Sequence, residues 1–155
     1  MLKRVRQTTI DNIGGRFAIV AAKYNGRYVD AMLRAAKNEL LKAGATNVKV
    51  VRVPGSFEIP AVAARLAQGR IPPLSAIICL GVIFQGETSH AQHVGWGVTH
   101  ALAQIQLQYK IPVVHGVLLF EKEQQAQVRC LGKKHNRGIE AARTALAMAA
   151  VMKSL

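Results

Sequence analysis

The sequence is poor in acidic residues, aromatic residues and cysteine. Of its 155 residues, 8 are Asp or Glu and 21 are Lys or Arg, which gives a formal net charge of +13. Only 5% are aromatic although 50% are hydrophobic, so we expect Val, Ile, Leu and Ala to fill the core. A chain of this length is sufficient for one domain with a substantial core.

Too few cysteines are present for a disulfide scaffold, and Cys79 and Cys130 fit no metal-ligand spacing. We expect both to be buried free thiols in a reducing compartment. The longest apolar stretch, 71–84, is interrupted by two prolines and a serine and is too short to span a membrane. The apolar run that begins at Phe17 ends before Lys23, which is shorter than a signal peptide requires. These absences predict a cytoplasmic protein without a membrane span.

The excess of positive charge is the least ordinary feature of the composition. A balance of this kind favours a polyanionic partner. The basic residues are nevertheless spread along the chain, and only segments 3–6 and 133–137 form clusters. The sequence has no zinc-finger spacing, no aromatic-rich RNA-binding strand and no clear helix-turn-helix. We therefore interpret the charge as a diffuse positive field, and expect at most non-specific binding of nucleic acid.

Apolar segments with strand character alternate with helical segments along the chain. The predicted strands are 16–22, 47–53, 75–80 and 113–119, and the predicted helices are 27–43, a segment ending near 68–69, 91–109, 121–131 and 138–153. This alternation is typical of a parallel sheet with right-handed crossovers. We predict an α/β fold, a three-layer αβα sandwich around a central, mainly parallel four-stranded sheet with flavodoxin-like winding.

The turn after the third predicted strand is the strongest candidate site. Segment 81–90 reads Gly-Val-Ile-Phe-Gln-Gly-Glu-Thr-Ser-His, and we expect a helix to start at Thr88 or Ser89, either of which can cap it. Free backbone N–H groups of residues 86–88 would suit an anion, and His90 beside them could transfer protons near neutral pH. The glycines of a dinucleotide-binding motif and the Gly-Lys-Ser/Thr ending of a P-loop are missing. A capped helix without an anion is an equal alternative.

Two further loops are expected at the same edge of the sheet. Tyr24 follows the first strand, and Ser56, Phe57 and Glu58 follow the second between two prolines. Ligands of open parallel sheets bind beyond the carboxyl ends of the strands. Taken alone, Tyr24 would pack a turn and Glu58 would only favour a helix N-terminus. The convergence of three loops is what favours a binding site.

The remaining candidate residues each have two interpretations. His93 lies one helical turn after His90, but no third ligand supports a metal site. His115 lies within a predicted parallel strand, where apolar residues are usual, so it is either a satisfied core histidine or faces a neighbouring subunit or a ligand. Arg129, on the helix after that strand, is either a surface charge or a phosphate clamp.

In chain order, the motifs resemble those of the 6,7-dimethyl-8-ribityllumazine synthase family. The matching segments are Tyr24-Asn25, 53–60 (Val-Pro-Gly-Ser-Phe-Glu-Ile-Pro), 81–90, 112–117, 125–129 and 136–142. They cover nearly the whole chain with family-like spacing. The Pro-Gly-Ser-Phe-Glu-Ile-Pro and Gly-Glu-Thr-Ser-His elements together are specific to that family.

The resemblance implies a transferase of riboflavin biosynthesis. It would condense 5-amino-6-(D-ribitylamino)uracil with 3,4-dihydroxy-2-butanone 4-phosphate, release phosphate and water, and use no metal or organic cofactor. His90 would transfer protons. The uracil and its ribityl chain would contact Tyr24, Ser56, Phe57, Glu58, Val82, Ile83, Phe84 and His115, and the phosphate would contact Gly86, Glu87, Thr88, Arg129 and Arg137. The competing hypothesis is a non-catalytic flavin- or lumazine-binding protein, or a shell that packages polyanions.

The resemblance also implies assembly. Members of the family form pentamers with each site between adjacent subunits, and the neighbouring subunit would supply His115 and Arg129. Some members assemble twelve pentamers into an icosahedral shell. The whole chain, 1–155, would be one domain, with 1–15 as an N-terminal arm that can pair with a neighbouring subunit. The connection 132–137 has no insertion, as in shell-forming members. Association with riboflavin synthase is a further implied partnership.

Several positions depart from the family pattern. Tyr24 stands where phenylalanine or tryptophan is usual, and His115 where phenylalanine is usual. Arg137 replaces a common lysine, which keeps the charge and changes the geometry. Residues 91–92, Ala-Gln, replace an aromatic-acidic pair, and nothing in the sequence explains that change.

Overall fold

A computed structural model describes residues 14–69 and 72–155, so most of the expected N-terminal arm lies outside the described residues. The elements are β1 (Arg16–Ala22), α1 (Gly26–Lys42), β2 (Asn47–Val53), the 3₁₀ helix η1 (Ser56–Glu58), α2 (Ile59–Ala67), β3 (Ala76–Phe84), α3 (His90–Tyr109), β4 (Val113–Phe120), α4 (Glu123–Cys130) and α5 (Arg137–Ser154). Strands and helices alternate as the sequence predicts.

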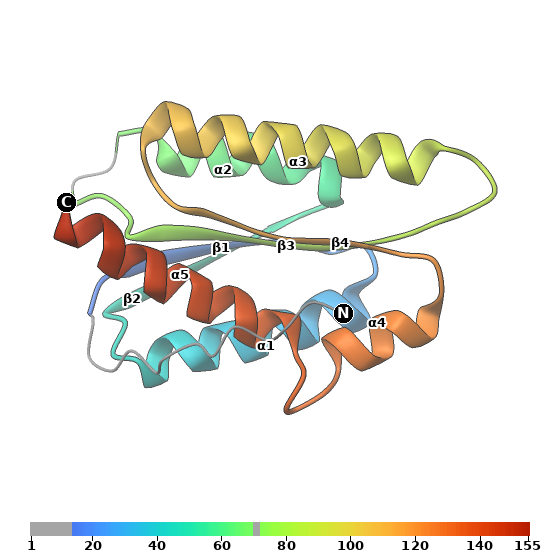
Figure 1. Ribbon diagram of the computed structural model, residues 1–155, viewed down its shortest axis with the longest axis horizontal. Coiled ribbons are helices and arrows are strands. Elements are labelled where there is room, and N and C mark those ends of the chain that lie inside the picture. The colour runs from blue at the N-terminus through green and yellow to red at the C-terminus, as the bar shows by residue number, and fades with distance from the viewer. Residues whose placement is uncertain (1–13, 70–71) are drawn as a thin grey trace.

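The four strands form one parallel sheet in the order β2-β1-β3-β4. Helices α2 and α3 cover one face, and α1, α4 and α5 cover the other (Figure 1). The predicted three-layer αβα sandwich with flavodoxin-like winding is therefore confirmed. Because the chain moves outward from β1 to β2 and then returns to β3 on the other side of β1, the winding reverses between β1 and β3.

The central strands are buried on both faces, as expected for a parallel sheet. In β1, Ile19 faces α1 and α5 and packs in one cluster with Met32, whereas Val20 faces α2 and α3 and packs with Val98. All four side chains are fully buried. Aliphatic side chains dominate both clusters, as the low aromatic content predicts.

Strand β3 extends further than the sequence predicts. The expected strand ends at Leu80, but the observed strand continues to Phe84 because residues 81–84 pair in register with 117–120 of β4. The prediction of a turn from Gly81 onward is therefore wrong. Tertiary pairing with β4 keeps this glycine-containing segment extended, and the turn begins only at Gln85.

Both cysteines are buried and free, which confirms the sequence prediction. Burial raises the pKa of Cys79 to about 12 and that of Cys130 to about 11. Both thiols are therefore protonated and unreactive at neutral pH. Across the described ranges, no helix is long and apolar enough to cross a membrane.

Helices α1 and α5 approach too closely for a side chain at the start of α5. A Cβ atom on Gly138 would lie 2.1 Å from the Met32 carbonyl oxygen. The buried Asn136 fixes this approach, because its Oδ1 accepts from the Gly138 N–H at 2.8 Å and its Nδ2 donates to the Cys130 carbonyl at 2.8 Å. Asn136 therefore holds the end of α4 and the beginning of α5 together.

We expect Gly138→Ala to lower the free energy of unfolding by about 1–3 kcal/mol, because the added methyl group forces α5 away from α1. The matched control is Gly95→Ala within α3, where a Cβ atom meets nothing within 4 Å. Higher helix propensity should make that variant about 0.5–1 kcal/mol more stable. Urea unfolding at one fixed protein concentration measures both changes. Equal stability of the two variants would contradict the close packing of α5 on α1.

Candidate functional site

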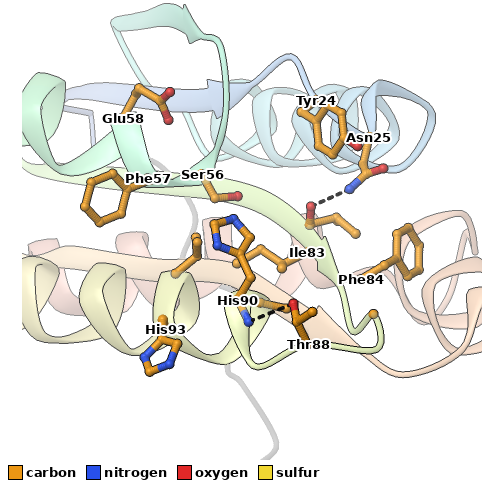
Figure 2. Close-up of a pocket in the computed structure, with 14 residues that line it drawn as sticks. Tyr24, Asn25, Ser56, Phe57, Glu58, Ile83, Phe84, Thr88, His90 and His93 are labelled. Carbon is orange, nitrogen blue, oxygen red and sulfur yellow. Dashed lines mark hydrogen bonds between the residues drawn. The ribbon is translucent and has the colours of Figure 1, made fainter.

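A cavity of about 750 Å³ opens at the carboxyl ends of β1, β2 and β3 (Figure 2). Its wall contains Tyr24, Asn25, Ser56, Phe57, Glu58, Val82, Ile83, Phe84, Gly86, Thr88, His90, Ala91, His93 and Val94. The cavity lies where the winding of the sheet reverses, which is where open α/β sheets bind ligands. The three loops that were predicted to converge do meet here.

The structure brings together ten of the predicted site residues and leaves four outside the cavity wall. The ten are Tyr24, Ser56, Phe57, Glu58, Val82, Ile83, Phe84, Gly86, Thr88 and His90. Glu87 lies in the adjoining turn with an exposed side chain, and His115, Arg129 and Arg137 lie on other elements. The cavity of one chain therefore contains the loops expected to bind the uracil, but not the two arginines expected to bind phosphate.

The turn before α3 is held by its own first residue. The Gln85 side-chain amide donates to the carbonyl oxygens of Gly86 and Thr88, both at 3.1 Å. Those carbonyls therefore face Gln85, and the N–H groups of Gly86 and Glu87 have no hydrogen-bond partner among the described residues. Free N–H groups beside a helix N-terminus suit an anion.

Helix α3 begins at His90, with Ser89 as its N-cap residue. Ser89, one of the two predicted start positions, is the N-cap residue, but its side chain makes no capping hydrogen bond. The hydroxyl of Thr88, the other predicted position, accepts a hydrogen bond from the His90 N–H at 3.4 Å. Helical geometry begins directly after these two positions, so His90 is the first residue of the helix.

His90 is exposed to the cavity, and Figure 2 shows its ring between Ser56 and Ile83. His93 lines the cavity one turn later on the same helix. Within residues 14–69 and 72–155, no three His, Cys, Asp or Glu side chains are grouped closely enough to hold a metal ion. The titratable groups in the wall are thus two imidazoles with Tyr24 and Glu58, which suits proton transfer.

Gly81 brings the second loop against the sheet. A Cβ atom on Gly81 would lie 2.4 Å from the Ser56 hydroxyl oxygen, so only glycine allows η1 to lie this close to β3. Ser56 is consequently buried at the base of the cavity, whereas Phe57 is 66% exposed and Tyr24 is 73% exposed. Two aromatic side chains with so much free surface offer flat contacts for a ligand or a second chain.

The end of β3 presents an unpaired backbone edge to the cavity. Pairing with β1 stops at Leu80, whereas pairing with β4 continues to Phe84. Within residues 14–69 and 72–155, the β1-facing edge of residues 82–84 therefore has no strand partner. Peptide groups in this arrangement can donate to and accept from a planar heterocycle.

Asn25 is the site residue to which the sequence analysis gave no role. Its Nδ2 donates to the Val82 carbonyl oxygen at 2.7 Å, and its backbone has left-handed geometry with φ 55°. It thereby ties the loop after β1 to the unpaired edge of β3. The sequence offers two signals for this residue: the Tyr24-Asn25 segment that resembles the family, and an Asn-Gly pair in a predicted turn, where asparagine tolerates left-handed geometry.

His115 lies on β4 and faces α3. Its Nδ1 accepts a hydrogen bond from the Val117 N–H at 3.3 Å, so the ring proton is on Nε2, which lies 2.8 Å from the Thr99 hydroxyl and donates to it. Although the side chain is exposed, contact with α3 removes solvent from part of the ring and lowers the pKa of His115. The imidazole is therefore neutral at pH 7 and both its nitrogens are satisfied.

The two predicted phosphate-binding arginines lie on the α1, α4 and α5 side of the sheet. Arg129 is exposed near the end of α4. Arg137, the first residue of α5, forms an ion pair with Glu140 at 2.7 Å. Neither reaches the cavity of its own chain.

Comparison with known proteins gives a consistent result. A sequence model of the 6,7-dimethyl-8-ribityllumazine synthase family matches residues 14–153. The chain is 38% identical to the 6,7-dimethyl-8-ribityllumazine synthase of Stenotrophomonas maltophilia over 142 residues, covering 90% of each chain. It is 39% identical to the enzyme of that name from Xanthomonas campestris pv. campestris, covering 90% and 91%, and 39% identical to that from Xylella fastidiosa, covering 92% of each.

We expect Asn25→Asp to lower the free energy of unfolding by about 1–3 kcal/mol at pH 7, because a carboxylate would face the Val82 carbonyl without a proton to donate. This repulsion holds the folded-state pKa of the introduced carboxyl above its unfolded value. The deficit relative to wild type should therefore shrink as the pH falls toward about 4.

The control is Asn25→Gly, which retains the left-handed backbone and removes only the hydrogen bond. Its cost should be about 0.5–1.5 kcal/mol and should not change with pH over that range. Urea unfolding at pH 7 and pH 4 tests both variants. A pH-independent deficit in Asn25→Asp would show that Asn25 does not donate to Val82.

Proposed function

Because the chain belongs to the 6,7-dimethyl-8-ribityllumazine synthase family, we propose that it condenses 5-amino-6-(D-ribitylamino)uracil with 3,4-dihydroxy-2-butanone 4-phosphate to give 6,7-dimethyl-8-ribityllumazine. The observation that carries this proposal is the cavity in which His90, the start of α3 and the unpaired edge of β3 face one another. A steady-state assay that follows lumazine absorbance with both substrates tests it. Absence of turnover by the assembled protein would favour the non-catalytic alternative.

The chemistry matches the groups in the cavity. A uracil amine nitrogen bonds to the ketone carbon and water leaves, phosphate is then eliminated, and the second amine closes the ring with loss of another water. Each step adds or removes a proton at a bound intermediate, so the reaction depends on positioning and proton transfer. We assign proton transfer to His90, which lies where both substrates would meet.

The uracil would occupy the side of the cavity near β3. We assign stacking on its ring to Tyr24 and contact with its polar edges to the backbone of residues 82–84, one edge of which lacks a strand partner. Residues 56–58 would hold the ring and the ribityl chain. Because Asn25 donates a hydrogen bond to the Val82 carbonyl, it would hold the backbone of this edge in one orientation for the ligand.

The phosphate would lie at the start of α3, where the N–H groups of Gly86 and Glu87 are available. Among the described residues, no arginine lines this part of the cavity. We therefore propose that a neighbouring subunit contributes Arg129 to bind phosphate and His115 to stack on the uracil. Arg137 remains a weaker candidate, because Glu140 already pairs with it.

A second copy of the chain is supported by exposed apolar side chains on η1, α3 and β4. Phe57, Trp96, Leu107 and Leu119 have 66%, 65%, 76% and 43% of their surface exposed. We propose a homopentamer, and a shell of twelve pentamers where salt or anions screen the charge of +13 per chain. Light scattering over a salt series distinguishes these states. Association with riboflavin synthase and a cytoplasmic location remain predictions from the sequence.

We expect His90→Ala to lower kcat roughly ten- to several hundred-fold while assembly is preserved, because positioning still contributes much of the catalysis. His100→Ala is the matched control, since it removes an exposed imidazole from the same helix outside the cavity wall. Its kcat should stay within about threefold of wild type, because His100 does not line the cavity. Full turnover of His90→Ala from pH 6 to pH 9 would exclude His90 from the mechanism.

We expect Arg129→Ala to weaken binding of the butanone phosphate by about 2 kcal/mol, the loss of one charge-assisted hydrogen-bonded pair. Affinity for the uracil should change little. Inorganic phosphate should also compete less well with the variant. Arg143→Ala, which removes an exposed positive charge from α5, is the control and should leave both affinities unchanged. Equal weakening of both substrates by Arg129→Ala would contradict a phosphate-specific role.

Mixed assemblies test whether the site is shared. Neither His90→Ala nor Arg129→Ala alone should be fully active. When the two variants are mixed in equal amounts and assemble at random, half of the sites contain an intact His90. Of those sites, half receive an intact Arg129 from the neighbouring chain. Activity should therefore recover to about one quarter of wild type. Recovery requires that the two residues come from different chains. No recovery in verified mixed assemblies would show that each chain supplies both residues.

A further inference from the structure

Tyr28, in the first turn of α1, joins three elements that meet near the cavity. Its hydroxyl donates a hydrogen bond to Oε1 of Glu123, the first residue of α4. The Tyr28 residue is only 4% exposed, and the Arg27 guanidinium lies over its ring, 5.5 Å from the centroid. A guanidinium nitrogen of Arg27 also lies 3.8 Å from Glu123 Oε1. Glu123 is therefore held from two sides by the start of α1.

The other side of the Tyr28 ring supports the cavity wall. It meets Phe84 in an edge-to-face contact, with centroids 5.7 Å apart and planes at 72°. Phe84 lines the cavity and lies against Phe120, at 6.3 Å between centroids. Edge-to-face pairs of this kind fix ring orientation as well as burying area. Displacement of Tyr28 would thus leave Phe84 without one of its two aromatic supports.

Helix α4 is short and is anchored mainly at its ends. At its beginning, the Gln125 side-chain oxygen accepts from the N–H groups of Glu121 and Lys122, which explains why the helix starts at Glu123 and not at the predicted residue 121. At its end, Cys130 is held by Asn136. The side chains of α4 other than the buried Ala126 and Cys130 are exposed. The hydrogen bond from Tyr28, together with the longer contact of Arg27 to the same carboxylate, therefore fixes the start of α4 against α1.

We propose that Tyr28 is a positioning residue that links Phe84 in the cavity wall to α4 and thereby sets the position from which Arg129 reaches the neighbouring site. The inference rests on the proposed function, in which Arg129 binds phosphate. The Tyr28 hydroxyl is a donor at neutral pH, because tyrosine is protonated there, and the hydrogen bond to Glu123 raises the pKa of Tyr28 further. Tyr28 would touch neither substrate.

Two substitutions separate the functions of the ring and the hydroxyl. Tyr28→Phe retains the edge-to-face contact with Phe84 and removes the bond to α4. We expect it to raise KM for the butanone phosphate and the inhibition constant of inorganic phosphate about three- to tenfold, with KM for the uracil within about twofold. Tyr28→Leu removes the ring as well, so we expect it to raise both KM values.

Substitutions of Glu123 test the same contact from α4 without changing the cavity wall. Glu123→Gln keeps an acceptor oxygen for the Tyr28 hydroxyl and should behave like wild type. Glu123→Leu removes the acceptor and should reproduce Tyr28→Phe, and the double variant should be no worse than either single variant. Tyr109→Phe, at the end of α3, is the matched control and should leave both KM values unchanged.

Amide hydrogen exchange of residues 123–130 supplies a readout that does not depend on turnover. Faster exchange in Tyr28→Phe and Glu123→Leu, together with the selective rise in KM for the phosphate substrate, supports the proposal. Unchanged KM for that substrate, or an equal rise for both substrates in Tyr28→Phe, overturns it, whatever the exchange rates. Absence of turnover in wild type would overturn the proposed function without testing the role of Tyr28. In that case, unchanged amide exchange in both variants would overturn the anchoring of α4 by Tyr28.

Discussion

The site depends on one mismatch in strand length. Pairing of β3 with β1 ends at Leu80, but pairing with β4 carries β3 on to Phe84. This extension leaves one backbone edge of the strand open at the point where the winding reverses. The surrounding elements adapt to it, since Asn25 takes the Val82 carbonyl and η1 packs over Gly81, where no side chain intervenes. The cavity exists because β4, at the edge of the sheet, supports β3 beyond its central neighbour.

The predictable parts of this fold are those with a local signal. The bounds of β1 and β2 match the predicted ranges because each is a continuous run between turn residues. The end of β3 was missed because a glycine within Gly-Val-Ile-Phe resembles a turn, and only pairing with residues 117–120 keeps it extended. The contact of Asn25 with Val82 joins residues 57 positions apart, so no local pattern could reveal it. Family motifs predicted most of the cavity wall, and the resemblance also implied that a neighbouring subunit supplies Arg129, which does not line the cavity of its own chain.

His115 shows how an unusual residue can be accommodated in a parallel strand. The family resemblance implies phenylalanine at this position, but a histidine stands here, and the backbone N–H of Val117 and the hydroxyl of Thr99 satisfy its two nitrogens. The ring is therefore neutral, planar and fixed in orientation. A ring held in this way can present its face as phenylalanine would, so the substitution is compatible with the stacking role proposed for this position. Its hydrogen bonds are internal to the chain and impose no partner on the exposed face.

The geometry of Asn25 also affects the deamidation of its side chain. In an Asn-Gly pair, the following backbone nitrogen can attack the side-chain amide with little obstruction, because glycine has no Cβ. Here the amide nitrogen is bound to Val82 and the backbone is fixed at the start of α1, so the folded chain keeps the amide away from that reaction. An unfolded or newly made chain has no such protection. The hydrogen bond that shapes the cavity therefore also protects the side chain that forms it.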